Sequence, residues 1–278
     1  MAIQHIIIVG GGTAGWMAAA ALSRLKAGRP VEITLIESEA IGTVGVGEAT
    51  IPPFVGFNDL LGIKESEMLA AVGGTFKLGI QFENWGNLGE SYIHPFGAYG
   101  YTMGGISFHH VWHRMNKAGD KRPIQVFNVE TMAAYFGKFA RTEDYANEDL
   151  PPVNYAYHLD SGKFGLFLQR HCIEKLGVEH IQDDVIAVQS ADNGDIAAVQ
   201  TQNHGLIAGD LFVDCTGFSS LLLGKHYQVP FKACDDILFI DTALAVQVPY
   251  DTPDAPIASH TISTAQEAGW IWDIGLQH

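Results

Sequence analysis

Cysteine is scarce in this sequence, and long apolar runs are missing. The three cysteines, Cys172, Cys215 and Cys234, are widely spaced and form no Cys-x-x-Cys pair. No disulfide framework is visible in this spacing, and a reducing cytoplasm is the compartment we expect. No apolar stretch reaches the ~20 residues that a membrane-spanning helix needs. The apolar start lacks the basic segment of a secretory signal, so we interpret it as a first strand.

Basic residues are also few. The sequence has 16 lysines and arginines against 31 aspartates and glutamates, which gives a net charge of −15. This balance argues against nucleic acid or an anionic membrane as a partner, because both select basic surfaces. A hydrophobic content of 47% and a charged content of 17% in 278 residues are typical of a well-packed chain. We expect one large domain or two interleaved ones.

Glycine is what the N-terminus has in quantity. A β-rich run, Ile6–Val9, ends in three glycines and passes directly into the strong helix former Met17–Leu22. Gly10, Gly12 and Gly15 stand in the Gly-x-Gly-x-x-Gly register, which predicts a strand, a tight turn and a helix. The first glycine permits the turn, the second lets a pyrophosphate approach, and the third lets helix and strand pack. The positive end of the helix would then face the phosphates.

A second predicted strand supports this interpretation. Val31–Ile36 is apolar and β-branched, and it ends in Glu37, 22 residues after Gly15. A carboxylate at about this spacing can accept hydrogen bonds from a ribose diol. The two stretches together predict a dinucleotide-binding site.

The next stretch, Gly42–Pro53, contains glycines at positions 42, 45 and 47 and a double proline. We predict a stiff loop of close approach here, and neither helix nor strand. At this point the sequence resembles the tryptophan halogenase family of flavin-dependent halogenases. Gly10–Ala19 carries the resemblance together with the more specific Gly45-Val46-Gly47-Glu48-Ala49-Thr50-Ile51-Pro52. In that family the second stretch is a strap beside the isoalloxazine ring of FAD.

The resemblance implies an α/β fold, in which a Rossmann-like FAD-binding domain is interleaved with a substrate region containing an antiparallel sheet. We expect the FAD-binding domain at 1–85 and 153–222, and the substrate-binding region at 86–152 and 223–278. The cofactor-binding residues that we assign are Gly10, Gly12, Thr13, Ala14, Gly15, Glu37, Gly47, Glu48, Ala49, Thr50, Val185 and Gly217.

A lysine follows in a strictly alternating segment. Thr75–Phe82 has the period of two of a strand, and this pattern alone predicts a solvated Lys77 on the polar face. The resemblance implies another role, because Phe76-Lys77 and Phe82-Glu83-Asn84-Trp85 match the segment that carries the family's catalytic lysine. An ammonium group would orient hypohalous acid, whereas a neutral amine would form a haloamine. Both roles favour an enclosed lysine, and the sequence leaves the choice open.

Two aromatic stretches resemble substrate-binding segments of the family. His94-Pro95-Phe96-Gly97 is similar to the motif in which His94 and Phe96 would sandwich an indole. Gly269–Gly275 matches a Trp-x-Trp-x-Ile-Pro signature, with Gly275 in place of proline. Trp270 and Trp272 would point to one side of a strand and wall the flavin from the substrate.

One departure concerns the substrate. Only eight residues separate Trp85 from His94, where tryptophan-specific members carry a longer insertion. This more open pocket favours other indoles, phenols, pyrroles or larger substrates over free tryptophan. His109 and His113 have the spacing of two metal ligands on a helix, but no third ligand follows, and we predict no metal site.

The later part of the chain returns to regular structure. We predict a helix over Phe164–Leu176 that Gly177 ends, and a hairpin that joins Val185–Val188 to Ile196–Val199. Strand Leu211–Val213 leads into the turn Asp214–Phe218, which in this superfamily returns the chain to the flavin.

The function that these residues and the resemblance imply is halogenation of an electron-rich, indole-type aromatic. FADH2, O2 and chloride or bromide would generate hypohalous acid, and Lys77 would direct it. A separate flavin reductase would supply the FADH2, and a homodimer is left open. The alternatives are an FAD monooxygenase and a non-catalytic flavin-binding fragment. Family members continue well beyond position 278, so we expect the halide-binding loop and a glutamate partner of the lysine to be absent here.

Overall fold

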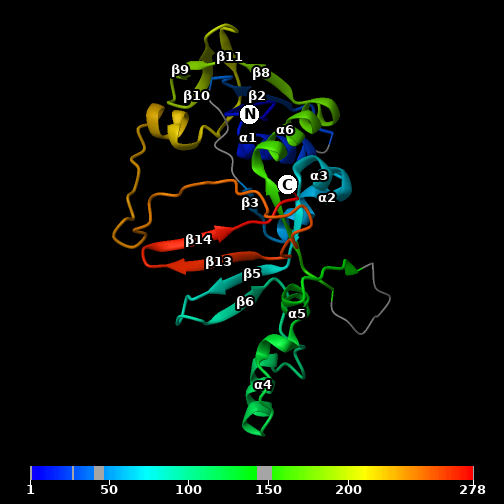
Figure 1. The fold of residues 1–278 in the computed structure, drawn as a ribbon. Coiled ribbons are helices and arrows are strands. Elements are labelled where there is room, and N and C mark those ends of the chain that lie inside the picture. The colour runs from blue at the N-terminus through cyan, green and yellow to red at the C-terminus, as the bar shows by residue number, and fades with distance from the viewer. Residues whose placement is uncertain (1, 27, 41–46, 143–151, 278) are drawn as a thin grey trace. The chain divides into compact units, whose positions relative to one another are not determined.

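The computed structural model describes residues 2–26, 28–40, 47–142 and 152–277, and these form two compact units (Figure 1). Unit 1 comprises Met1–Val46, Phe57–Val72 and Ser161–Leu244, and unit 2 comprises Gly47–Gly56, Gly73–Asp160 and Ala245–His278. No helix in the described part of the chain has the length and apolarity to cross a membrane.

Unit 1 is built on a parallel sheet. Its strands β1 (His5–Val9), β2 (Glu32–Glu37), β8 (Glu179–Gln182) and β12 (Leu211–Asp214) lie in the order β12-β1-β2-β8. Helix α1 (Thr13–Leu25) connects β1 to its parallel neighbour β2. The predicted strand, turn and helix at the N-terminus are therefore confirmed.

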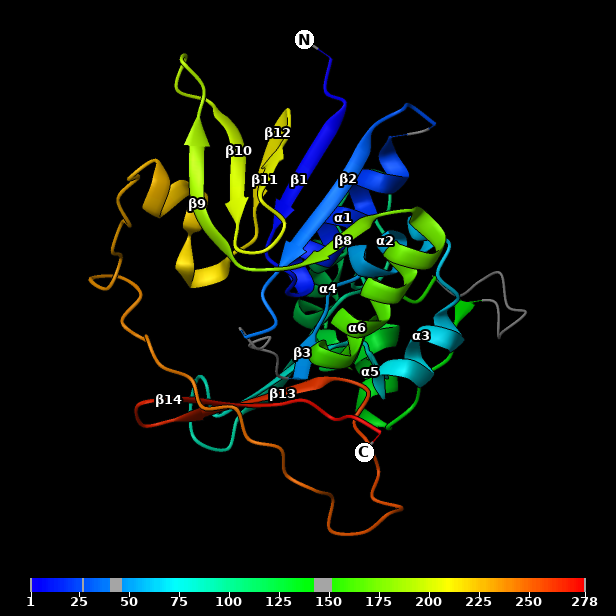
Figure 2. The same ribbon diagram turned by 90° about the horizontal axis from the view of Figure 1, so that it is seen from above.

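The parallel sheet lies between two different layers (Figure 2). Helices α1 and α6 (Ser161–His171) pack together on one side, and α3 (Glu65–Val72) packs against α6. The other side meets an antiparallel sheet of β9 (Val185–Ser190), β10 (Ile196–Thr201) and β11 (Leu206–Ala208), which contains the predicted hairpin. Both faces of β1 are consequently buried, as its continuous apolar run requires.

The core between the two sheets of unit 1 is aliphatic. Ile7 and Ile36 of the parallel sheet pack with Val199 of β10 and with Leu222, which lies in the π-helical turn η5 (Leu221–His226). Each of these side chains is at most 3% exposed, so each contributes about 1.5–3 kcal/mol through burial.

Helix α6 differs from the predicted Phe164–Leu176 helix. It begins earlier, at Ser161, and ends at His171, and the wider π-helical turn η3 (Cys172–Leu176) follows. Gly177 ends this turn in the left-handed conformation, with φ 68°, as predicted. The change in winding coincides with Cys172, which is fully buried and whose thiol donates to the carbonyl of Trp16 at 3.6 Å.

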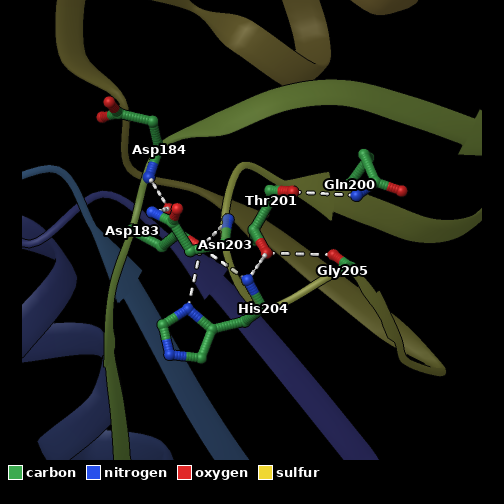
Figure 3. Close-up of polar contacts among 7 residues, drawn as sticks. All are labelled: Asp183, Asp184, Gln200, Thr201, Asn203, His204 and Gly205. Atoms are coloured by element: carbon green, nitrogen blue, oxygen red, sulfur yellow. Dashed lines mark hydrogen bonds and ion pairs between the residues drawn. The ribbon is translucent and has the colours of Figure 1, made fainter.

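A carboxylate organises the junction between the two sheets of unit 1 (Figure 3). Asp183 accepts hydrogen bonds from Asn203, from the backbone N–H of Asp184 at 2.8 Å and from His204 Nδ1 at 2.7 Å. Burial alone would raise the pKa of Asp183, but these hydrogen bonds hold it well below its usual range. The backbone N–H of Asp183 donates to the carbonyl of Glu37, so the turn before β11 is joined to the end of β2.

Unit 2 contains two sheets (Figure 1). Strands β3 (Gly47–Ala49), β7 (Ala156–Asp160) and β4 (Thr75–Lys77) form an antiparallel sheet in the order β3-β7-β4. Strands β14 (Gly269–Asp273), β13 (Thr261–Gln266), β5 (Gly79–Glu83) and β6 (Ser91–Pro95) form the second sheet, in which only the β13–β5 pair is parallel. The predicted α/β fold with an antiparallel sheet is confirmed.

Short helices complete unit 2. Among the described residues they include α4 (Phe108–Lys117), the 3-10 helix η1 (Ile124–Phe127) and α5 (Val129–Tyr135). Asn128 caps α5, because its side-chain oxygen accepts from the N–H of Thr131 at 2.6 Å. The core of the unit includes Leu78, Ile93 and Ala134.

Among the described residues, the predicted loop over Gly42–Pro53 is confirmed at Thr50–Pro52 and is wrong on both sides of that stretch. Gly47–Ala49 is the strand β3, and helix α2 (Pro53–Leu61) begins at the second proline. Glycine does not exclude a short strand whose backbone pairs with a neighbour, here β7. Proline is well tolerated in the first turn of a helix, where its missing N–H has no partner to lose. Gly42 and Gly45 lie outside the described residues.

Candidate functional site

The glycine loop of unit 1 has the geometry that a close-approach turn requires. Gly10 has φ +112°, and a Cβ added to it would collide with the carbonyl of Cys215 in the turn after β12. A Cβ on Gly15 would collide with the carbonyl of Gly10 and would lie 3.5 Å from Leu35 of β2. A Cβ on Gly12 would meet no atom within 4 Å. Two glycines thus permit the turn and its packing, while the third leaves open space.

The start of α1 suits an anion. Gly12 is the N-cap, and Thr13, Ala14 and Gly15 form the first turn, where the N–H groups have no partner within the helix. The hydroxyl of Thr13 donates to the carbonyl of Ser161 at 3.3 Å, which fixes the loop to α6. Oriented N–H groups beside the open space at Gly12 fit a pyrophosphate.

Glu37 lies against this loop. A Cβ on Gly11 would collide with the Glu37 side chain and its Oε2 atom. The other oxygen, Oε1, accepts from His180 Nε2 at 2.7 Å and from Gln169 Nε2 at 2.9 Å. The structure therefore brings the predicted loop and the predicted acidic residue together. Gln169 and His180 were missed, because they are 132 and 143 positions from Glu37 and no motif marks them.

The remaining predicted cofactor residues of unit 1 are Val185 and Gly217. Val185 is the first residue of β9 and pairs with Thr201 of β10. Gly217 opens the 3-10 helix η4 (Gly217–Ser219), directly after the turn that contacts Gly10. The carboxylate of Asp214 shapes this turn by accepting from Thr216 and from later backbone N–H groups.

The prediction of a solvated Lys77, made from the alternating sequence pattern, is wrong. Its side chain is 2% exposed instead of solvated. The alternating segment is two strands, because the chain leaves one sheet at Lys77 and enters the other at Gly79. Leu78, between them, is fully buried and belongs to neither strand. The alternation in the sequence therefore does not describe one continuous face.

The surroundings of Lys77 are almost neutral. Its Nζ atom donates to the main-chain carbonyl of Thr50 at 3.0 Å and lies 5.2 Å from the centroid of the Phe96 ring. Among the described residues no carboxylate lies within ion-pair distance of Lys77. Burial lowers the pKa of Lys77 from 10.5 to about 8. The structure thus places the predicted lysine beside one predicted strap residue and one predicted substrate-binding residue.

The other strap residues, Gly47, Glu48 and Ala49, form β3, and burial raises the pKa of Glu48. Thr50 follows them, and both its backbone and its side chain form hydrogen bonds with the backbone of Tyr157. Its N–H donates to the carbonyl of Tyr157 at 2.8 Å, and its hydroxyl accepts from the N–H of Tyr157 at 2.9 Å. The carbonyl that binds Lys77 is consequently fixed to β7.

A buried histidine holds the strand that carries Lys77. His158 of β7 lies between Thr75 Oγ1, at 3.1 Å from Nδ1, and Thr261 Oγ1, at 2.8 Å from Nε2. The hydroxyl of Thr75 donates a hydrogen bond to the carbonyl of Gly275 at 2.6 Å. Nδ1 of His158 must therefore donate to the oxygen of that hydroxyl. Burial, with smaller effects of Lys77 and His260, lowers the pKa of His158 to about 3. This neutral ring joins β4 to β13.

The predicted aromatic residues of unit 2 share one face of a sheet. The pairings of β6 with β5, of β5 with β13 and of β13 with β14 place His94, Trp270 and Trp272 on the same face. Trp270 is 46% and Trp272 is 41% exposed. The ring centroids of Trp270 and Trp85 are 5.9 Å apart.

The same face carries aromatic residues that were not predicted as part of the site. Phe82 and Tyr92 stack with a centroid distance of 5.2 Å, and Trp85 meets Phe82 edge to face. Their cross-strand register was the missing information. In the described ranges no group of three His, Cys, Asp or Glu residues could hold a metal ion.

Comparison with known proteins shows the family to which this chain belongs. The family model described as tryptophan halogenase matches residues 5–278. The chain belongs to the tryptophan halogenase family. A 7-chloro-L-tryptophan 6-halogenase from Kutzneria sp. (strain 744) is 38% identical over 98% of this chain and 55% of its own length. A tryptophan 7-halogenase from Lentzea aerocolonigenes is 36% identical over 99% of this chain and 54% of its own length.

Solved structures of this halogenase family have the same fold. A flavin-dependent halogenase from Xanthomonas campestris is 44% identical and superposes with a TM-score of 0.91, over 100% of this chain and 54% of that one. A flavin-dependent halogenase from Brevundimonas sp. BAL3 is 35% identical with a TM-score of 0.86, over 99% of this chain and 55% of that one. The chain spans about half the length of the curated relatives that it matches.

Proposed function

We propose that this protein takes part in the flavin-dependent halogenation of an indole-type aromatic, with Lys77 as the catalytic residue. The observation that carries the proposal is a fully enclosed lysine whose hydrogen-bond acceptor is the main-chain carbonyl of Thr50. A lysine without a counter-ion is costly to bury, so its persistence in the interior favours a chemical role.

The cofactor in this proposal is FAD, used as FADH2. The open space at Gly12 and the start of α1 fit a pyrophosphate, and Glu37 fits a ribose. Gly47–Thr50, Val185 and Gly217 are the further residues that we assign to FAD by the family resemblance. When bound and reduced, FAD with O2 and chloride or bromide supplies hypohalous acid.

Lys77 would direct that small oxidant. Its Nζ donates one hydrogen bond to Thr50 and can donate others to the oxygen of hypohalous acid. With a pKa of about 8, Lys77 changes between ammonium and amine close to neutral pH. A rate that falls as the pH rises through 8 would indicate the orienting ammonium, and a rate that rises would indicate the haloamine.

The substrate in this proposal is an indole. Relatives named tryptophan halogenases support an indole ring as the group that reacts. The exposed rings of Trp270 and Trp272 provide flat aromatic surface, and Phe96 lies next to Lys77. The connection between β5 and β6 is only seven residues, from 84 to 90, which favours a pocket open enough for larger indoles. A separate flavin reductase in the cytoplasm would supply FADH2.

The test is a halogenation assay with FAD, NADH, a flavin reductase and bromide, with tryptophan or indole as substrate. Both the 278-residue chain and any longer protein that its gene encodes are assayed, with a tryptophan 7-halogenase as positive control. Mass spectrometry should show the gain of one bromine. Oxygenated product would instead indicate a monooxygenase, and peroxide alone would indicate a flavin-binding fragment.

Lys77→Ala should abolish bromination and leave FAD binding intact. Lys64→Ala is the matched control, because Lys64 is exposed and forms an exposed ion pair with Glu67 of α3. Wild-type product yield from Lys77→Ala would remove Lys77 from the mechanism.

A further inference from the structure

The carboxylate of Glu37 is held by one of its two oxygens. His180 Nε2 and Gln169 Nε2 both end on Oε1, at 2.7 and 2.9 Å. A carboxylate only accepts, so His180 Nε2 carries the hydrogen of this bond. Within the described part of the chain no donor is assigned to Oε2, and this oxygen is the one that lies over Gly11.

The two donors come from different elements of unit 1. His180 lies on β8, which runs parallel to β2, and it pairs with Leu35 on the face of the sheet that Glu37 also occupies. Gln169 lies in the last turn and a half of α6. Because a helix and a strand both hold Glu37, its side chain loses little conformational freedom when a ligand binds.

His180 is itself held in place. The indole ring of Trp16 in α1 is 1% exposed and meets the imidazole edge to face, with centroids 5.1 Å apart and planes at 68°. Trp16 is in the same helix whose first turn faces the open space at Gly12. The orientation of Glu37 is thereby linked to the position of α1.

We propose that His180 and Gln169 are positioning residues for the adenosine ribose of FAD, which saturate Oε1 of Glu37 so that Oε2 alone accepts from the ribose hydroxyl groups. This inference rests on the proposed FAD site and adds to it the selection of a ribose diol. Without the two donors, Glu37 could rotate away from Gly11 or offer the wrong oxygen.

The experiment measures two dissociation constants by quenching of flavin fluorescence. One ligand is FAD, and the other is an FAD analogue whose adenosine lacks both ribose hydroxyl groups. The wild-type chain should bind FAD about tenfold or more tightly than the analogue, as expected for hydrogen bonds to a charged group. His180→Phe and Gln169→Met should each reduce this ratio several-fold, and His180→Gln should restore part of it.

Glu37→Gln provides the reference for a double-mutant cycle. Adding His180→Phe to this variant should change the ratio no further, because Glu37 transmits the effect. A wild-type ratio in both single variants, or an equal loss of affinity for both ligands, would overturn the inference. Gln169 is only half-buried, so its variant keeps the test available if His180→Phe does not fold. Failure of the wild-type chain to bind FAD at all would instead refute the proposed function.

Discussion

The glycine loop of unit 1 and the strand β4 of unit 2 prepare sites in opposite ways. The loop does so by omitting side chains, since two of its positions would collide with backbone carbonyls and a third opens onto empty space. Strand β4 does so by enclosing a charged side chain where a main-chain carbonyl is its acceptor. The first arrangement is steric and depends little on pH, whereas the second is electrostatic and titrates near pH 8.

Substitution within the loop should have the largest effect. Gly10→Ala should lower the free energy of unfolding by about 3 kcal/mol, because it combines a left-handed φ with a collision against the carbonyl of Cys215. Gly12→Ala should leave stability within about 0.5 kcal/mol and weaken FAD binding. Urea unfolding of both variants measures this difference. Equal destabilisation by the two would show that the open space at Gly12 is not there.

The second-largest effect should come from removing the hydrogen bonds of Thr75, which join β4 to His158 and Gly275. Thr75→Val should cost about 2 kcal/mol, because it leaves Nδ1 of His158 and the carbonyl of Gly275 without their partner in a buried place. Thr75→Ser keeps the hydroxyl and is the matched control. If valine and serine are equally stable in thermal unfolding, the hydrogen-bond chain does not hold the strand.

Removing the buried charge should have a smaller effect of opposite sign. Lys77→Met should raise the free energy of unfolding at pH 7 by about 1 kcal/mol, because an uncompensated charge no longer has to be buried. In the wild type the folded-state pKa of about 8 lies below the 10.5 of a free lysine. Between these values the unfolded chain binds the proton that the folded chain has released, so the contribution of Lys77 to stability should rise with pH.

Denaturant titrations of the wild type and Lys77→Met from pH 7 to pH 10.5 check this prediction, and the stability of the wild type relative to the variant should rise over this window. The difference between the two chains is the measure, because burial also raises the pKa of Cys172 to about 12, which makes the stability of both chains fall at high pH. An identical pH dependence in the two chains would mean that Lys77 keeps its proton in the folded state. The smallest effect should come from Lys64→Ala, which should leave the denaturant midpoint unchanged, because its ion pair with Glu67 is exposed to solvent.

The glycine loop of unit 1 could be predicted well from the sequence, because local backbone geometry determines it. Gly10 and Gly15 are needed for a local turn and its immediate packing, and the glycines themselves indicate it. The α/β fold followed from the same stretch and from the family resemblance. Where packing between distant segments decides, local pattern was insufficient, as the strand at Gly47–Ala49 and the burial of Lys77 show.

The contacts of the candidate site depend on such distant segments. Lys77 meets the carbonyl of Thr50 because β4 and the residues after β3 both pair with β7. Glu37 meets Gln169 and His180 across more than 130 positions of sequence. No periodicity within a window of 10 to 20 residues contains this information.

The bond between Lys77 and Thr50 bears on how this site can change in evolution and in the laboratory. Its acceptor is a peptide carbonyl, so no side-chain replacement at position 50 deletes it directly. The Thr50 hydroxyl serves a separate link, to Tyr157. Substitutions at position 50 can therefore shift the position of Lys77 in small steps, while the main-chain carbonyl that accepts its hydrogen bond stays in the chain.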